Sequence, residues 1–357
     1  MPPNPKPQLA PRRFFLHVSA GPLEDACGHV PIMARPAGEG RLVRIYVDAE
    51  VAAADLAPGL VAETIRLLDD EIIPRSRELL GEHADVDGDG KLAVLLTPWL
   101  GKLRGGKTSL NGCVRANDFQ AGIEAPFSNS ADLVYLNSHL TCGPALKTLL
   151  AHEYTHAVCF SRRFARAAGA LPVEDDWLNE AMAHVAENLH ETGWSNLAER
   201  IESFLAAPHT APLVVPDYYR AGLWRDPACR GATFLFLRFC VDQFGDRLLG
   251  KLAGSPLTGP RNLEQATGVP FPELVRHWTI ALANDRIASL PLSSKLGDRQ
   301  LQGMRRIDWK VDGAPCAVDL RGTSASLVRL SAASPGPVRV TLRSAASAKL
   351  QVTLIRR

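Results

Sequence analysis

The chain has 357 residues, of which 46% are hydrophobic and 22% are charged, and its formal net charge is +2. A chain of this length and composition can form two or three globular domains, each with its own core. Its basic residues are scattered rather than clustered, so the sequence predicts no nucleic-acid partner. No apolar run is long enough for a transmembrane helix. The seven cysteines include no C-x-x-C pair that would indicate a zinc cage, and their disulfide pairing stays open.

The first residues are predicted to be flexible. Residues 1–40 are rich in Pro and Gly, and the apolar stretch at 14–18 is too short and too polar for the core of a signal peptide. Residues 41–143 are predicted to form an α/β lobe, with one helical pattern at 55–81 and short strand patterns at 41–47, 92–96 and 133–136.

The remainder of the chain changes its hydrophobic period twice. Residues 144–290 are predicted to be a helical lobe, with helices near 145–166, 175–192, 196–206, 231–244 and 272–288. A polar, aperiodic stretch at 291–305 is a candidate linker. Residues 305–357 then alternate apolar and polar positions, which predicts a small antiparallel β domain. The fold class is therefore predicted to be α+β, with a mixed N-terminal lobe, a helical C-terminal lobe and a small β domain.

An acidic turn precedes one of the predicted strands. Asp85, Asp87 and Asp89 alternate with Val and Gly, which makes the turn a candidate calcium site. It is not an EF-hand, because the twelfth position counted from Asp85 is Leu96 where a bidentate Glu is required. The alternative is an Asp- and Gly-rich turn without metal.

Residues 152–156 read His-Glu-Tyr-Thr-His, which matches the zinc-peptidase pattern H-E-x-x-H. Side chains four residues apart lie on one face of a helix, so His152 and His156 can bind one metal ion. Glu153 lies beside that pair, where a general base for a metal-bound water belongs. The alternative is a pair of core histidines that hydrogen-bond to the backbone.

A hydrolytic zinc site needs three protein ligands and one water, so the two histidines require a third donor. Glu180 follows His156 by 23 intervening residues and lies on a second predicted helix among apolar positions, including Trp177 and Ala181. A carboxylate in such surroundings is costly unless a cation neutralises it. Glu180 is therefore the candidate third ligand, and an exposed helix residue is the alternative.

Together these segments resemble the gluzincin metallopeptidases, whose third ligand lies in an Asn-Glu pair such as Asn179-Glu180. Within that group the chain is most similar to the hyicolysin family of bacterial neutral metallopeptidases. The acidic turn at 85–91 and the stretch at 231–245 support the likeness, which spans roughly residues 40–250. The resemblance implies a zincin-like fold, one zinc ion held by His152, His156 and Glu180, and Glu153 as the general base. It also implies a secreted or periplasmic location, although the chain shows no signal peptide.

Further residues are candidates for supporting roles. His184 and Glu187 lie one and two turns beyond Glu180, and Asp176 lies at the predicted start of that helix, so all three can orient the metal ligands. A developing oxyanion also needs a hydrogen-bond donor. Related sequences often carry a Tyr just before Gly231, whereas this chain has Ala228-Cys229-Arg230 there. The candidate donors are therefore Tyr218, Tyr219, His209 and Arg230.

The predicted function is zinc-dependent hydrolysis of internal peptide bonds in a peptide or protein substrate. A metal-activated water attacks the scissile carbonyl, Glu153 takes its proton, and the substrate pairs with an edge strand within residues 110–118. One alternative is a zinc exopeptidase, which would need an acidic group for the substrate's free amine. The other is a catalytically weak zinc-binding module, which the missing Tyr before Gly231 favours.

Overall fold

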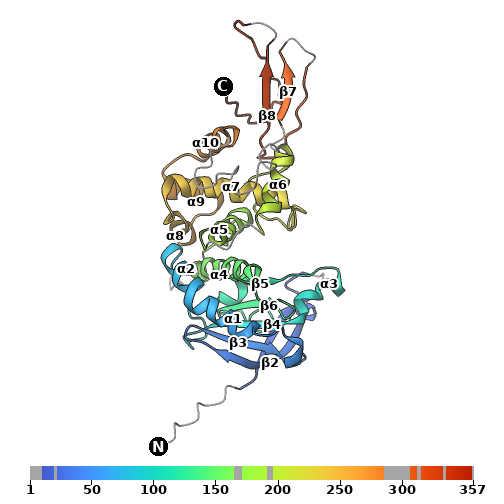
Figure 1. The fold of residues 1–357 in the computed structure, drawn as a ribbon, viewed down its shortest axis with the longest axis vertical. Coiled ribbons are helices and arrows are strands. Elements are labelled where there is room, and N and C mark those ends of the chain that lie inside the picture. The colour runs from blue at the N-terminus through green and yellow to red at the C-terminus, as the bar shows by residue number, and fades with distance from the viewer. Residues whose placement is uncertain are drawn as a thin grey trace, which may run out of the picture. The chain divides into compact units, whose positions relative to one another are not determined.

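The computed structural model describes residues 10–19, 22–164, 171–190, 196–284, 306–311, 315–332 and 335–355 (Figure 1). The chain divides into two compact units. The first contains residues 1–173, 186–193 and 249–256, and the second contains residues 174–185, 194–248 and 257–357. The predicted α+β class is confirmed, since a mixed sheet is followed by a run of helices and a small β element. The predicted linker at 291–305 lies outside the described residues.

The first unit is built on a six-stranded sheet with the strand order β1-β2-β3-β4-β6-β5. Its strands are β1 (Arg12–His17), β2 (His29–Glu39), β3 (Val43–Asp48), β4 (Leu92–Thr97), β5 (Gly112–Val114) and β6 (Leu133–Asn137). Strands β3, β4 and β6 run parallel, while β1 and β2 pair antiparallel on one side. Strand β5 pairs antiparallel with β6 and forms the opposite edge of the sheet.

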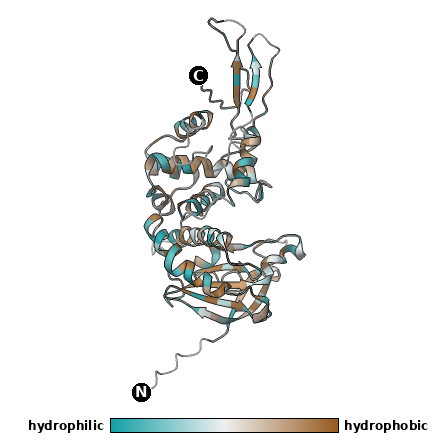
Figure 2. Ribbon diagram, in the orientation of Figure 1, coloured by the Kyte–Doolittle hydropathy of each residue, from teal (hydrophilic) through white to brown (hydrophobic). Residues whose placement is uncertain are grey.

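Both faces of the central strands are covered, which explains their nearly continuous apolar sequences (Figure 2). On one face Phe14, Tyr46, Leu95 and Tyr135 belong to a single core cluster. The other face is packed by helices α1 (Leu60–Leu67) and α4 (Pro144–Phe164), and α2 (Ile73–Leu79) packs against α4. A π-helical stretch, Leu68–Ile72, joins α1 to α2, so the helix predicted at 55–81 is one continuous helical run from 60 to 79.

The prediction that residues 1–40 form a flexible segment is wrong for most of the described part. Residues 12–17 and 29–39 are strands β1 and β2, which extend the sheet beyond β3. The reason is an alternation of buried side chains that the prolines and glycines obscured: Phe14, Leu16, Ile32 and Ala34 are all at most 3% exposed.

Short elements connect the strands of the first unit. Helix α3 (Leu103–Gly106) is a single irregular turn in which Arg104 and Gly105 adopt left-handed backbone angles. The 3₁₀ turns of the chain are Ala26–Gly28, Ala53–Asp55, Pro98–Gly101, Ala116–Phe119 and Pro208–Thr210. Helix α8 (Leu248–Ala253) also falls almost entirely in the first unit.

The second unit is helical apart from its end. Its helices are α6 (Ala198–Ala206), α7 (Pro227–Phe244), α9 (Gly259–Thr267), α10 (Phe271–Ala283) and the first ten residues of α5 (Asp176–Leu189). Helix α7 is buried along most of its length and packs closely on α6. At Gly231 a Cβ atom would lie 2.0 Å from the carbonyl oxygen of Arg200, so only glycine permits this approach. None of the described helices is long and apolar enough to cross a membrane.

The β element at the end of the chain differs from the predicted one. Strands β7 (Arg306–Lys310) and β8 (Leu327–Ser331) form a two-stranded sheet, and they run parallel rather than antiparallel. The segment between them is longer than a tight hairpin turn and lets the second strand begin at the same end as the first. The alternating residues at 338–342 and 350–354 are not assigned to strands.

Candidate metal centre

Helix α4 carries the two histidines. Its inner face is apolar, with Leu150, Ala157 and Val158 buried, and this packing fixes the helix on the sheet. His152 and His156 project from one face, where their Nε2 atoms lie 3.1 Å apart and their rings are nearly perpendicular at 78°. Two nitrogens bound to one tetrahedral zinc at 2.0–2.1 Å would be separated by about 3.3 Å. The spacing of the pair therefore suits shared coordination.

A buried polar network holds the middle of α4 in place. The hydroxyl of Tyr154 lies 2.8 Å from Nδ1 of His83, and Nε2 of the same ring lies 3.2 Å from a carboxylate oxygen of Asp132. Tyr154 and Asp132 are each 1% exposed, and burial raises the pKa of both groups. The sequence predicts no role for His83 or Asp132, because neither belongs to a recognisable motif.

Glu187 determines which nitrogen of His152 is available. Its Oε1 lies 2.7 Å from Nδ1 of His152, and its side chain is fully buried. A carboxylate can only accept a hydrogen bond, so Nδ1 carries the proton and Nε2 keeps its lone pair. Carboxylate-histidine pairs of this kind orient metal-binding histidines.

Glu180 completes a group of three candidate ligands. The ligand atoms of His152, His156 and Glu180 all lie within 4.8 Å of one another. Neighbours of Glu180 on α5, Trp177 and Ala181 among them, are fully buried, as the apolar pattern predicted. One oxygen of the Glu180 carboxylate, Oε2, lies 2.6 Å from Nη1 of Arg230.

The donors of this group fit a zinc ion. Two imidazole nitrogens and one carboxylate are a usual set of three protein ligands, and they leave a fourth position for water. The hydrogen bond that Glu187 accepts from Nδ1 of His152 favours the tautomer of His152 that a metal requires. The residues present would therefore hold zinc through Nε2 of the two histidines and one oxygen of Glu180.

Glu153 is 5% exposed and touches the edge strand of the sheet. A Cβ atom on Gly112 of β5 would lie 2.9 Å from Cγ and 3.0 Å from Oε1 of Glu153. The strand therefore approaches the carboxylate as closely as glycine permits. The edge strand predicted within residues 110–118 is β5, but the sequence alone does not indicate its contact with Glu153.

The other candidate supporting residues occupy different places. His184 is 1% exposed, and one of its ring nitrogens lies within 4.8 Å of a ring nitrogen of His152 and of a carboxylate oxygen of Glu187. Asp176 instead accepts a hydrogen bond from the backbone N–H of Tyr218 at 2.8 Å. Burial raises the pKa of Asp176, against the lowering effect of that bond.

Of the predicted oxyanion donors, Tyr218 is the one placed against a partner of Glu180. It is 1% exposed, and the guanidinium of Arg230 lies 4.2 Å from the centroid of its ring. Tyr219 exposes 58% of its surface. His209 lies in the turn Pro208–Thr210, and its backbone carbonyl accepts hydrogen bonds from Arg321 and Ser324.

The carboxylate oxygens of Asp85, Asp87 and Asp89 lie within 4.8 Å of one another, but each group has a partner within the protein, so the calcium prediction gains no support. Asp85 accepts hydrogen bonds from the backbone N–H groups of Gly88, Asp89 and Gly90. Asp87 pairs with Arg12 at 2.6 Å, and Asp89 pairs with Arg44. Each of the three carboxylates therefore has a protein partner that stabilises the turn, and two of the partners are arginines.

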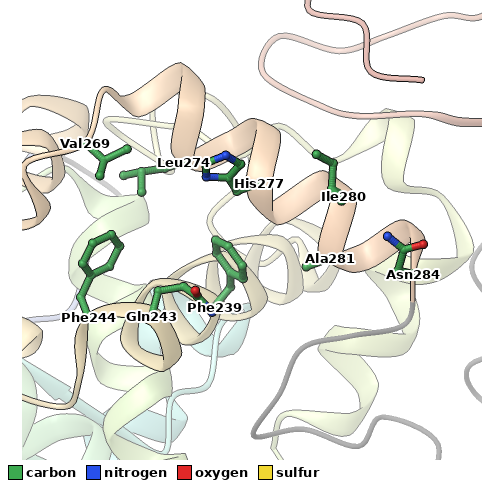
Figure 3. Close-up of a pocket in the computed structure, with 9 residues that line it drawn as sticks. All are labelled: Phe239, Gln243, Phe244, Val269, Leu274, His277, Ile280, Ala281 and Asn284. Atoms are coloured by element: carbon green, nitrogen blue, oxygen red, sulfur yellow. The ribbon is translucent and has the colours of Figure 1, made fainter. Parts of the chain in front are cut away.

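A hollow of about 510 Å³ lies elsewhere in the second unit, along α7 and α10 (Figure 3). Its lining is mainly apolar and includes Phe239, Phe244 and Leu274, with His277 at one side. None of the candidate ligands lines this hollow.

Comparison with known proteins found partial similarity. No family model matches the chain. Neutral metalloprotease ShpI of Staphylococcus hyicus is 28% identical over 130 residues, which cover 34% of this chain and 29% of that protein. The match thus spans less than a third of the length of that relative. A crystal structure of Legionella pneumophila aminopeptidase A in complex with aspartic acid covers 75% of this chain and 28% of its own, at 11% identity and a TM-score of 0.39. A likeness at that score carries no argument here.

Proposed function

We propose that the chain is a zinc-dependent metallopeptidase that hydrolyses internal peptide bonds. The observation that carries the proposal is the group of His152, His156 and Glu180, with Glu153 next to it on the same helix. The similarity to a neutral metalloprotease supports it. On the same grounds we assign the chain to the hyicolysin type of gluzincins and to a location outside the cytoplasm.

Zinc bound at this group would polarise the scissile carbonyl and lower the pKa of a coordinated water. Glu153 is the residue that accepts the proton of the attacking water and returns it to the leaving amine. Glu187 keeps His152 in the tautomer that binds metal. Arg230, which pairs with Glu180, and Tyr218, which lies against Arg230, are the donors that we assign to meet a developing negative charge.

The position of β5 at an edge of the sheet suggests how a peptide binds. Strand β5 pairs with β6 on one side only, so an extended substrate can add to its other side. Because Gly112 of β5 contacts Glu153, a peptide paired there would pass the general base. This mode holds the substrate by its backbone and does not require a free terminus, which favours cleavage of internal bonds.

The first test replaces the base and retains the ligands. Glu153→Gln should bind zinc as the wild type does and lose at least a hundredfold in the turnover of an unstructured protein such as casein, since a general base contributes about 10²–10⁴-fold. Unchanged hydrolysis by the zinc-loaded variant would refute the mechanism. Peptides with a blocked amino terminus separate the alternatives, because an exopeptidase would leave them intact.

The second test concerns the third ligand. Glu180→Ala should lower the zinc content of the purified protein well below one ion per chain, since two histidines alone do not complete the site. Zinc occupancy equal to that of the wild type would remove Glu180 from the ligand set. The catalytically weak zinc-binding module is the surviving alternative if zinc is bound normally but no peptide is cleaved.

A further inference from the structure

Arg230 contacts the candidate ligand Glu180 and two other parts of the second unit. Its Nη1 lies 2.6 Å from Oε2 of Glu180, and its Nη2 donates a hydrogen bond to the carbonyl oxygen of Trp224 at 3.1 Å. The plane of the guanidinium is supported by the ring of Tyr218, at 4.2 Å from the Arg230 Cζ. Both terminal nitrogens and one face of the Arg230 guanidinium thus contact other residues of the second unit.

The backbone beneath this side chain is equally well fixed. Arg230 lies in the first turn of α7, where the side chain of Asp226 caps the helix by accepting a hydrogen bond from the N–H of Cys229 at 3.0 Å. The next residue, Gly231, is pressed against the backbone of α6 at Arg200. A guanidinium anchored in this way has little freedom left to lose when it binds a carboxylate.

Both side chains of this ion pair are largely withdrawn from water. The side chain of Arg230 is 13% exposed and that of Glu180 is 24% exposed. An ion pair in such surroundings is screened less by water and salt than one at the surface. The guanidinium lies against Oε2 and so disfavours binding of a metal through both carboxylate oxygens at once.

We propose that Arg230 is a positioning residue that holds Glu180 as a single-oxygen ligand. This inference rests on the proposed metal centre, and it adds a role in metal selection. Zinc accepts a tetrahedral set in which a carboxylate contributes one oxygen. Cations that require six or more oxygen ligands, such as Ca²⁺, depend on bidentate carboxylates. With Oε2 of Glu180 paired with the guanidinium of Arg230, the site favours zinc over those cations.

The test measures metal affinity and not hydrolysis. The zinc dissociation constant of the full chain is determined by competition with a chelating dye, and that of Ca²⁺ by titration. Arg230→Met should weaken zinc binding by about 10- to 100-fold, the usual effect of removing a partner of a metal ligand, and should narrow the preference for zinc over Ca²⁺. Arg230→Lys keeps the charge but not the two-armed planar group, so its zinc affinity should lie between those of the wild type and Arg230→Met.

Two controls separate positioning from loss of structure. Arg238→Met breaks another ion pair of α7, between Arg238 and Asp242 at 2.6 Å, and should leave zinc affinity unchanged. Tyr218→Phe keeps the supporting ring and should retain wild-type zinc affinity, whereas Tyr218→Leu should weaken it. Thermal unfolding of each variant identifies any that do not fold, in which case Arg230→Lys carries the measurement.

The direction of the change in zinc affinity tests the proposal, because the positive charge of Arg230 also repels a bound zinc ion. Loss of that repulsion alone would strengthen zinc binding. Zinc binding by Arg230→Met that equals or exceeds that of the wild type would overturn the proposal. Failure of the proposed peptidase function would be a separate result from failure of the Arg230 proposal. Glu153→Gln tests hydrolysis and leaves Arg230 and the three candidate ligands in place.

Discussion

Replacing Gly112 by alanine should impair catalysis without impairing folding. The added Cβ would lie 2.9 Å from Cγ, 3.1 Å from Cδ and 3.0 Å from Oε1 of Glu153. Carbon atoms in contact prefer about 3.5–4.0 Å, so the Glu153 side chain must move by about 0.5–1 Å. A displacement of that size at a reacting group can cost about 100-fold in rate. Stability should change by less than about 1 kcal/mol, because a flexible side chain yields and glycine itself weakens a strand by about 0.5–1 kcal/mol.

The measurement is turnover of a blocked peptide by the zinc-loaded protein, together with zinc content and thermal unfolding. Gly101→Ala is the matched control, since its Cβ would meet only the side-chain amide of Asn137, at 3.3 Å. If Gly112 acts through Glu153, then Gly112→Ala should cause no further loss in a Glu153→Gln background. An equal loss in both backgrounds, or full turnover by Gly112→Ala, would refute the reasoning.

Two further predictions concern buried groups near α4. Glu187→Gln should weaken zinc binding by about 10-fold or more although the three candidate ligands remain. The reason is that an amide does not hold Nδ1 of His152 protonated as a carboxylate does. Unchanged zinc affinity in a competition with a chelator would contradict this prediction. His190 pairs with the hydroxyl of Ser76 at 3.0 Å, and burial, followed by the charges of Lys147 and Arg75, lowers its pKa from 6.5 to about 4. The folded state therefore holds this ring neutral, so its contribution to stability is present above pH 6.5 and is lost as the pH falls toward 4. The loss should reach about 3 kcal/mol at pH 4. His190→Gln should flatten this part of the pH profile of thermal unfolding, and a profile identical to that of the wild type would contradict it.

Strands and helices with a strong local pattern could be predicted from the sequence. Strands β4 and β6 are short runs that are apolar up to their last residues, and α4 and α5 repeat their apolar residues at helical spacing. Strands β1 and β2 could not be found in this way, because Pro31 and Pro36 interrupt β2 and favoured a flexible segment. Their place is set by packing: Phe14 and Ile32 enter the core cluster only once the rest of the sheet exists.

The candidate ligands could be predicted from the sequence for a different reason. Two histidines one helical turn apart need no knowledge of the fold to be placed on one face. The contacts that define their surroundings join residues far apart in the chain, such as Gly112 to Glu153 and Asp132 to His83. Such contacts depend on which strand reaches the edge of the sheet and which loop passes beneath the helix, and neither is encoded in a local spacing.

The departure at residues 228–230 and the setting of Glu180 are linked by the structure. A Tyr before Gly231 offers a neutral hydroxyl, which can donate one hydrogen bond but cannot neutralise a carboxylate. Arg230 does neutralise the Glu180 carboxylate, and Tyr218 lies directly against the guanidinium. The aromatic ring and the positive charge thus come from two positions here. If Tyr218 is the oxyanion donor, Tyr218→Phe should lower turnover while zinc affinity stays at the wild-type value, whereas Arg230→Met should lower both. A Tyr218→Phe variant with full turnover would instead leave the guanidinium as the group that meets the oxyanion.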